Sequence, residues 1–304
     1  MDKILVTPKI NTDLDGTSCA LAYADLLNKT GKSAEAVIFG EPQSEVQYFV
    51  KDHGIQISTQ PDGKTGSWDE FILVDASSMK GMPKIVDPNK VVEIIDHRTG
   101  EPEKEFPNAK IQNDLIGAAA TIVVERFIEA KLKPQPDHAK LLYGAIYHNT
   151  LNFIATNASE RDRKAAKFLE KEFGLNGKLI REMFDFATRR IEQNPKQALQ
   201  DDAKEFGEGY LIGAYQLIVW GAEVFKQKSI IEETIGELSK KFNVDWSFLN
   251  IVDLETKKST IYCSDKVGQD LLTKASGCNF ENGWSELDRA WLRKQIMPKI
   301  NELL

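Results

Sequence analysis

The 304-residue sequence is poor in cysteine and has no long apolar run. Its three cysteines, Cys19, Cys263 and Cys278, are widely spaced and form neither a CxxC pair nor a disulfide framework. No stretch approaches the roughly 18 uncharged apolar residues of a membrane span, and the first residues lack the apolar core of a secretory signal. We therefore expect a cytoplasmic protein with no membrane partner.

The chain also lacks an excess of positive charge. It has 39 Lys and Arg against 46 Asp and Glu, a net charge of -7, which argues against duplex nucleic acid as a partner. Hydrophobic residues make up 41% and charged residues 28%, the balance of an ordinary globular protein. Its length is sufficient for two domains.

The hydrophobic pattern of the first half predicts an α/β domain with a parallel sheet. Amphipathic stretches at 18–29 and 44–53 have helical spacing and predict helices on both faces of that sheet. The strands are predicted where the sequence is continuously apolar, as in sheets covered on both sides, at 3–6, 34–39, 71–76 and 91–96.

The pattern changes twice further along the chain. From 117 to about 192 it predicts consecutive helices, and then Pro195 and its polar neighbours interrupt the periodicity. We therefore predict a first domain at 1–190, a linker at 191–200 and a smaller α/β domain at 201–304.

Acidic residues follow the predicted strands at the edge where parallel sheets bind ligands. Asp13 and Asp15 follow the first strand, Asp75 ends the third, and Asp96 with His97 ends the fourth. Carboxylates with one imidazole suit Mn²⁺ or Mg²⁺, and the histidine favours manganese. Each residue also has an ordinary explanation, since an Asp in DLDG often caps a helix.

The segment IGAAATIV at 116–123 has two explanations. It can be a glycine-led helix start whose backbone amides face an anion, or its small residues can serve close helix packing.

Taken in order, NTDLDG, ILVDAS, IIDHRTG and YHNTLNF resemble the motifs of the DHH superfamily of phosphoesterases. The resemblance runs nearly end to end and is narrower for the manganese-dependent, family II inorganic pyrophosphatases. It implies a DHH catalytic domain and a smaller, DHHA2-type domain that clamps substrate across a cleft, and homodimers are common in this family. The segments that carry the narrower resemblance are FGEPQSEVQYFV, IGAAATIV, DAKEF, IGAYQL and RKQIMP.

The resemblance implies two metal positions, which this chain matches incompletely. Three residues depart from the family pattern, since Lys9 replaces a histidine, Asn149 an aspartate, and Arg98 the last histidine of the DHH triplet. The implied first position comprises Lys9, Asp13 and Asp75, and the second comprises Asp15, Asp75, His97 and Asn149.

Counting charges on these residues favours one ion. Asp13, Asp15 and Asp75 give -3 and Lys9 adds +1, so the sum of -2 balances one divalent cation, Mn²⁺ or Mg²⁺. We expect the Lys9 ammonium near the missing first metal, facing the substrate. The Asn149 carbonyl oxygen is an additional candidate ligand.

The remaining roles also follow from the resemblance. Asp75 holds the metal at the catalytic centre, Asp13 is either a ligand or the base that activates water, and Asp96 orients His97. Arg98 contacts phosphate, because its guanidinium pairs with phosphate in a bidentate manner. The expected phosphate ligands of the second domain are Lys204, Arg293 and Lys294.

The sequence thus predicts a hydrolase of phosphoanhydrides, with inorganic pyrophosphate or short polyphosphate as the small substrate. One alternative is a phosphodiesterase of short oligonucleotides or cyclic dinucleotides, which DLDG favours and the second domain disfavours. Another is a phosphate-binding relative that has lost turnover through Lys9, Asn149 and Arg98.

Overall fold

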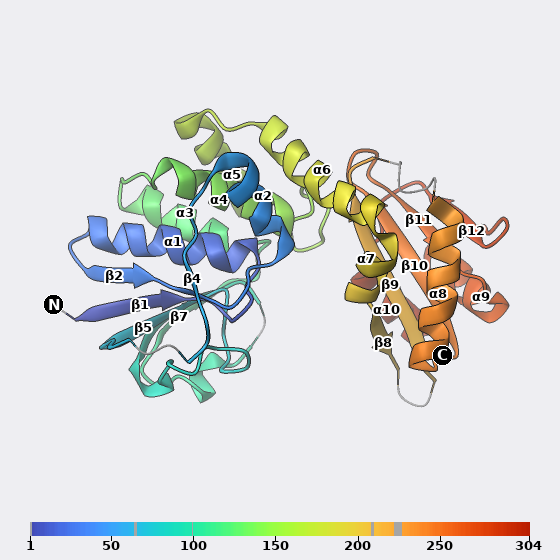
Figure 1. Ribbon diagram of the computed structural model, residues 1–304, viewed down its shortest axis with the longest axis horizontal. Helices are drawn as coiled ribbons and strands as arrows, with labels where there is room; N and C mark the ends of the chain where they lie inside the picture. The colour runs from blue at the N-terminus through green and yellow to red at the C-terminus, as the bar shows by residue number, and fades with distance from the viewer. Residues whose placement is uncertain (1, 64–65, 99, 208–209, 222–226) are drawn as a thin grey trace. The chain divides into compact units, whose positions relative to one another are not determined.

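The computed structural model describes residues 2–63, 66–98, 100–207, 210–221 and 227–304 (Figure 1). The chain divides into two compact units, Met1–Met183 and Phe184–Leu304. The division falls within helix α6 (Gly177–Gln193), and most of the predicted linker at 191–200 is occupied by the end of α6 and by α7 (Pro195–Asp201).

The first unit is built on a parallel sheet of five strands in the order β2-β1-β5-β6-β7. The α/β class and the parallel sheet are therefore confirmed. The strands are β1 (Lys3–Thr7), β2 (Ser33–Ala36), β5 (Glu70–Val74), β6 (Val91–Asp96) and β7 (Lys110–Asn113). A separate pair joins β3 (Ile38–Phe39) and β4 (Thr59–Gln60).

Helices cover one face of this sheet (Figure 1). α1 (Leu14–Lys29) and α3 (Ala119–Glu129) lie against the strands. α2 (Ser44–His53), α4 (Pro136–Asn149) and α5 (Glu160–Phe173) pack on these two helices. The other face packs against the segments 76–90 and 100–109, where Met82, Val86 and Phe106 cover strand residues. Helices were predicted on both faces, but 76–90 and 100–109 cover the second face with irregular chain and the short 3-10 helices η1 (Pro88–Lys90) and η2 (Pro102–Lys104).

The second unit contains a mixed sheet in the order β12-β11-β10-β9-β8. Strands β9 and β10 are parallel and the other pairs are antiparallel. The strands are β8 (Lys204–Phe206), β9 (Ile212–Val219), β10 (Trp246–Asp253), β11 (Lys258–Tyr262) and β12 (Trp284–Leu287). The predicted second α/β domain is thus present.

Helices lie on both faces of the mixed sheet. α7 and α8 (Lys228–Phe242) pack on one face, and α9 (Lys266–Ser276) and α10 (Arg293–Asn301) on the other. A Cβ atom at Gly268 of α9 would lie 2.4 Å from the Trp246 ring, so glycine permits this close helix–sheet contact. The hydrophobic pattern of the sequence did not lead us to predict helix α9.

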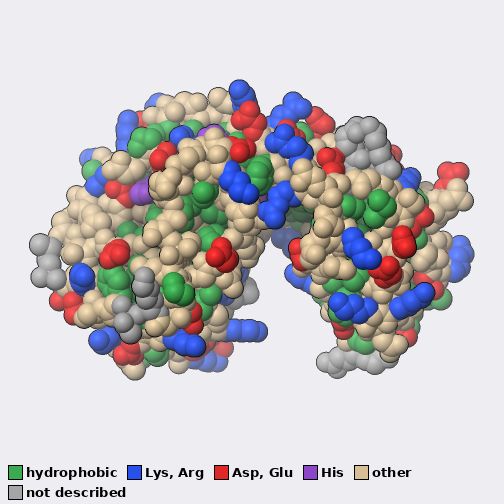
Figure 2. Space-filling view, viewed as in Figure 1, with side chains coloured by type: hydrophobic (Ala, Val, Ile, Leu, Met, Phe, Trp, Pro, Cys, Tyr) green, Lys and Arg blue, Asp and Glu red, His purple; other side chains and the backbone are tan. Residues whose placement is uncertain are grey.

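The surface carries both signs of charge. On the face shown in Figure 2, acidic and basic side chains are interspersed. Within the part of the chain that the structure describes, no helix combines the length and apolar character that spanning a membrane requires.

Candidate metal centre

Two of the candidate ligands follow neighbouring parallel strands. Asp75 follows β5 and His97 follows β6, so the carboxyl ends of the paired strands bring them together. His97 Nε2 lies 3.4 Å from Asp75 Oδ1. Asp75 has a positive φ of 51°, and its amide donates to the Ile95 carbonyl oxygen at 2.8 Å, which fixes this unusual backbone conformation.

The third ligand candidate comes from a helix. Asp13 caps α1 by accepting a hydrogen bond from the Gly16 amide at 3.0 Å, so the helix starts at Leu14 and Asp15 lies in its first turn. Asp15 is fully buried, and its Oδ2 lies 3.7 Å from His97 Nε2. One ligand atom from each of Asp15, Asp75 and His97 lies within 4.8 Å of the others, a geometry that can hold a metal ion.

The Asp15 carboxylate is held by the start of α3. The backbone amides of Ala119 and Ala120 donate to its two oxygens, each at 2.8 Å. Asn149 Nδ2 donates to Asp15 Oδ2 at 2.6 Å. The amide nitrogen of Asn149 therefore orients Asp15, and its carbonyl oxygen is the atom that could contact a cation.

The His97 ring has the orientation of a metal ligand. Its Nδ1 lies 3.1 Å from the Ile116 carbonyl oxygen, which can only accept a hydrogen bond, so Nδ1 carries the proton. Nε2 then faces Asp15 and Asp75. A backbone carbonyl that fixes the tautomer in this way is typical of metal-binding histidines.

Burial and mutual repulsion disturb the charges of this cluster. Burial raises the pKa of Asp15 to about 8, and the Asp75 charge adds to this effect. Burial also raises the pKa of Asp75 to about 6. Burial alone would lower the pKa of His97, but its hydrogen bond with Asp75 and the neighbouring carboxylates raise it to about 9. The cluster is therefore short of positive charge, which a divalent cation can supply.

Arg98 supplies part of that charge. Its NH2 group bonds to Asp75 Oδ1 at 2.5 Å and also donates to the Asp75 carbonyl oxygen, while its Nε donates to Asp96 Oδ1 at 3.2 Å. The Arg98 side chain remains 43% exposed. The predicted phosphate ligand is thus bound to a candidate metal ligand in this structure.

Asp96 and Lys9 differ in their relation to the cluster. Asp96 Oδ1 accepts from the His97 backbone amide at 2.8 Å, so Asp96 holds the main chain of His97 while Ile116 orients its ring. Lys9 lies in the loop after β1, with its aliphatic stem beside Gly81. Among the described residues the Lys9 ammonium has no hydrogen-bond partner or ion pair. Its predicted proximity to a metal stays a prediction.

In the second unit, the three predicted phosphate ligands have different environments. Arg293 is largely buried, and its NH1 bonds to Asp202 Oδ2 at 2.5 Å and to the Ala214 carbonyl oxygen at 2.9 Å. Lys204 on β8 and Lys294 in the first turn of α10 are exposed. Anion binding by these three side chains stays a prediction, and for Arg293 it would compete with the Asp202 pair.

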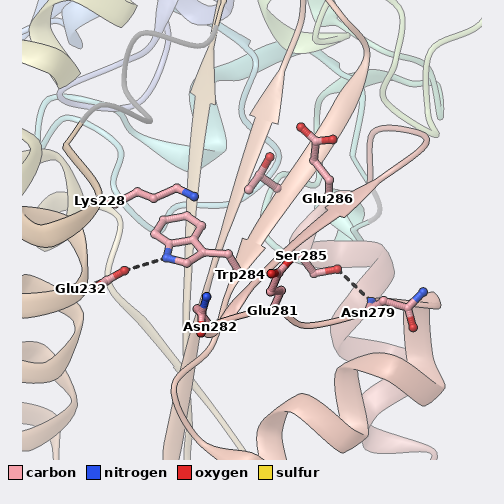
Figure 3. Close-up of a pocket in the computed structure, with 9 residues that line it drawn as sticks. Lys228, Glu232, Asn279, Glu281, Asn282, Trp284, Ser285 and Glu286 are labelled. Carbon is pink, nitrogen blue, oxygen red and sulfur yellow. Dashed lines mark hydrogen bonds between the residues drawn. The ribbon is translucent and has the colours of Figure 1, made fainter.

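The second unit also has a cavity of about 610 Å³, lined by Trp284 and its neighbours (Figure 3). The Trp284 indole N–H donates to Glu232 at 2.7 Å, and the Lys228 ammonium lies 4.7 Å from a ring centroid of Trp284. Ser285 Oγ accepts from the backbone amide of Asn279 at 2.9 Å. These side chains bind one another, and none of the predicted phosphate ligands lines this cavity.

Sequence reasoning left the role of 116–120 open. The structure supports both explanations: the Asp15 carboxylate is the anion at the start of α3, and a Cβ atom at Gly117 would lie 2.4 Å from Thr150 Cγ2. The signal was the glycine-led run of small residues. The sequence did not show that these amides bind Asp15, because Asp15 lies 104 residues before Ala119.

A family model and several known proteins are similar to this chain. Residues 3–146 match the DHH family, N-terminal domain. A probable manganese-dependent inorganic pyrophosphatase of an Exiguobacterium species is 28% identical over 307 residues, 99% of each chain. The manganese-dependent inorganic pyrophosphatase of Bacillus subtilis is 27% identical over 319 residues, 100% of this chain and 99% of that one.

A solved structure shares the fold. The crystal structure of a candidate family II inorganic pyrophosphatase from Methanococcus jannaschii aligns with a TM-score of 0.67 and 23% identity, covering 98% of each chain. At this identity the likeness shows the fold alone.

Proposed function

We propose that this chain, whose residues 3–146 match the DHH family, N-terminal domain, is a phosphoesterase. Its substrate in this proposal is a phosphoanhydride, inorganic pyrophosphate or a short polyphosphate, and Asp15, Asp75 and His97 hold manganese. The relatives that align over their full length are named as manganese-dependent inorganic pyrophosphatases, which supports this substrate class. The chain offers the ligand types that such an ion uses, two carboxylates and one imidazole.

The observation that carries the proposal is the convergence of these three ligands. Their donor atoms lie within 4.8 Å of one another, although they come from α1 and from the ends of β5 and β6. The Ile116 carbonyl leaves His97 Nε2 as the nitrogen facing the carboxylates. An ordinary structural ion pair needs neither the fixed tautomer nor the third ligand.

We propose a single tightly bound ion. Asp13 is engaged as the cap of α1, and Lys9 stands where the family pattern has a histidine. Asn149 donates its amide nitrogen to Asp15, so it offers a neutral oxygen where the family pattern has a carboxylate. Two of the three residues of the first implied position, Lys9 and Asp13, are thus weakened as ligands, whereas the Asn149 change falls on the position of the proposed ion.

The chain's own groups then have distinct tasks in the reaction. A bound divalent cation lowers the pKa of its water and polarises a phosphoryl oxygen. Asp15 and Asp75 hold that cation, and Asp96 fixes the main chain at His97. Arg98 is partly exposed beside Asp75, so its guanidinium can contact a phosphoryl group and offset charge as the leaving oxygen departs.

A second candidate function is a phosphate-binding protein with little or no turnover. It is favoured by one observation, the contact of Arg98 with Asp75 Oδ1. A guanidinium on that oxygen occupies a lone pair that a metal would use. If Arg98 stays there in solution, the site binds anions through a protein cation and lacks the activated water.

Phosphate release separates the two functions. Wild-type protein is assayed for phosphate release from pyrophosphate and tripolyphosphate, and for mononucleotide release from a dinucleotide, in Mn²⁺, Mg²⁺ or Co²⁺. Asp75→Asn is assayed beside it with the matched control Asp270→Asn, an exposed carboxylate of α9. We expect pyrophosphate or tripolyphosphate turnover with Mn²⁺ that Asp75→Asn abolishes and Asp270→Asn retains. Turnover of the dinucleotide alone, or pyrophosphate binding without phosphate release, would contradict the proposal.

A further inference from the structure

The short segment 116–120 supports two of the three candidate metal ligands at once. The carbonyl oxygen of Ile116 accepts from the His97 ring at 3.1 Å. The amides of Ala119 and Ala120 donate to Asp15, each at 2.8 Å. A displacement of this segment would therefore move His97 and Asp15 together.

Asp162 holds both ends of this segment. Its side chain is fully buried. Its Oδ2 accepts from the Gly117 amide at 3.1 Å, and its Oδ1 accepts from the Thr121 hydroxyl at 2.6 Å. The two bonds bracket Ala119 and Ala120, the residues whose amides bind Asp15.

The packing around Gly117 leaves this segment little freedom. A Cβ atom at Gly117 would lie 2.4 Å from Thr150 Cγ2 and 2.9 Å from Asp162 Oδ2. The glycine thus lets the main chain approach Asp162 closely enough for the Gly117 amide to reach the carboxylate. Thr150 in turn directly follows Asn149, which also binds Asp15.

Helix capping accounts for only part of the Asp162 contacts. Asp162 and Ser159 form a capping box at the start of α5, in which the Ser159 backbone amide donates to Asp162 Oδ2 at 2.7 Å and the Asp162 backbone amide donates to Ser159 Oγ at 3.4 Å. The Ser159 hydroxyl also donates to Asp162 Oδ2 at 2.7 Å. A capping box is complete with these bonds. The bonds to Gly117 and Thr121 lie outside it and connect α5 to the start of α3.

We propose that Asp162 is a positioning residue of the metal centre, which acts on Asp15 and His97 through the main chain of 116–120. This inference rests on the proposed function, because it assumes that those residues bind a metal. Partners that orient metal ligands typically affect metal affinity by about 10- to 100-fold when they are changed. We expect Asp162 to fall at the lower end, because it acts through one intervening segment.

Mn²⁺ titration of the metal-free protein by calorimetry tests the proposal independently of turnover. Asp162→Asn places an amide donor against the Gly117 amide or the Thr121 hydroxyl, and we expect the Mn²⁺ Kd to rise by about tenfold or more. Ser159→Ala is the matched control, since it removes a capping bond and leaves the bonds to Gly117 and Thr121. It should lower the Tm by a few degrees and change the Kd less than twofold.

A second pair of variants guards against misfolding of Asp162→Asn. Thr121→Val removes the hydroxyl that donates to Asp162 and should raise the Mn²⁺ Kd, whereas Thr121→Ser keeps the hydroxyl and should retain the wild-type Kd. The visible spectrum of bound Co²⁺ should shift in Asp162→Asn and Thr121→Val, and stay as in wild type in Ser159→Ala.

The possible failures are distinct. An unchanged Kd in both Asp162→Asn and Thr121→Val would overturn the positioning role while the metal centre stands. A rise in Ser159→Ala equal to that in Asp162→Asn would also overturn it, since general loss of stability would then explain the effect. Wild-type protein that binds no Mn²⁺ would refute the proposed function itself, and the positioning role with it.

Discussion

Replacing Arg98 with glutamine should strengthen metal binding and weaken turnover. Arg98 places a positive charge on Asp75 Oδ1, one of the oxygens proposed to bind the cation. Two unit charges about 4 Å apart interact by about 1 kcal/mol in water and about 4 kcal/mol at an effective dielectric constant of about 20. Because the Arg98 side chain is 43% exposed, the value in water is the better guide.

A divalent cation doubles this repulsion to about 2 kcal/mol, which corresponds to about a 30-fold change in Kd. We therefore expect Arg98→Gln to bind Mn²⁺ about 10- to 30-fold more tightly. Its turnover should fall, because the same guanidinium is proposed to contact the phosphoryl group. Arg98→Lys retains the charge and should keep the Mn²⁺ affinity closer to that of wild type.

Calorimetric Mn²⁺ titration and phosphate release measure the two effects separately. Arg189→Gln, at an exposed arginine of α6, is the control for the change in net charge. A Kd for Arg98→Gln that equals or exceeds the wild-type value would refute the electrostatic reasoning. It would mean that the contact of Arg98 with Asp75 supports the metal ligand more than its charge opposes the cation.

Two further substitutions test other parts of the structure. Asn149→Asp replaces a hydrogen bond to Asp15 with a second carboxylate, so the Tm of the metal-free protein should fall. The double variant Asn149→Asp with Lys9→His should bind a second Mn²⁺ and hydrolyse substrate faster. If metal analysis shows no second ion, other groups of the site have also diverged. Arg293→Met should lower the free energy of unfolding in urea by about 2 kcal/mol, less than the roughly 3–5 kcal/mol of a fully buried pair because Asp202 keeps 28% exposure. The exposed Lys294→Met is its control, and equal urea midpoints for the two variants would show that the Arg293 pair is not structural.

The strands that precede Asp75 and His97 were predictable because both are rich in apolar, β-branched residues. The predicted strand at 91–96 matches β6 residue for residue, and the one at 71–76 overlaps β5. Since parallel strands present their carboxyl ends at one edge, adjacency of these two residues followed from the sequence alone. The predicted strand at 34–39 instead divides into β2 and β3, which belong to different sheets.

The environment of Asp15 could not be predicted in the same way. The helical pattern was expected to begin at 18, but the Asp13 cap starts α1 at Leu14 and carries Asp15 into the helix. The amides of Ala119 and Ala120 that bind Asp15 come from a distant part of the chain. Local periodicity contains no information on such a contact, which depends on how α1 and α3 pack.

The origin of the three ligands has a mechanical consequence. Asp75 and His97 extend from the sheet, whereas Asp15 belongs to α1, which also packs on that sheet through apolar side chains and the Tyr23–Glu93 hydrogen bond. An ion bound by all three would act as a cross-link between two layers of the unit. Binding of the ion would therefore restrain movement of α1 over the sheet. Substitutions far from the site that change the distance between α1 and the sheet would change how well the three ligands fit the ion.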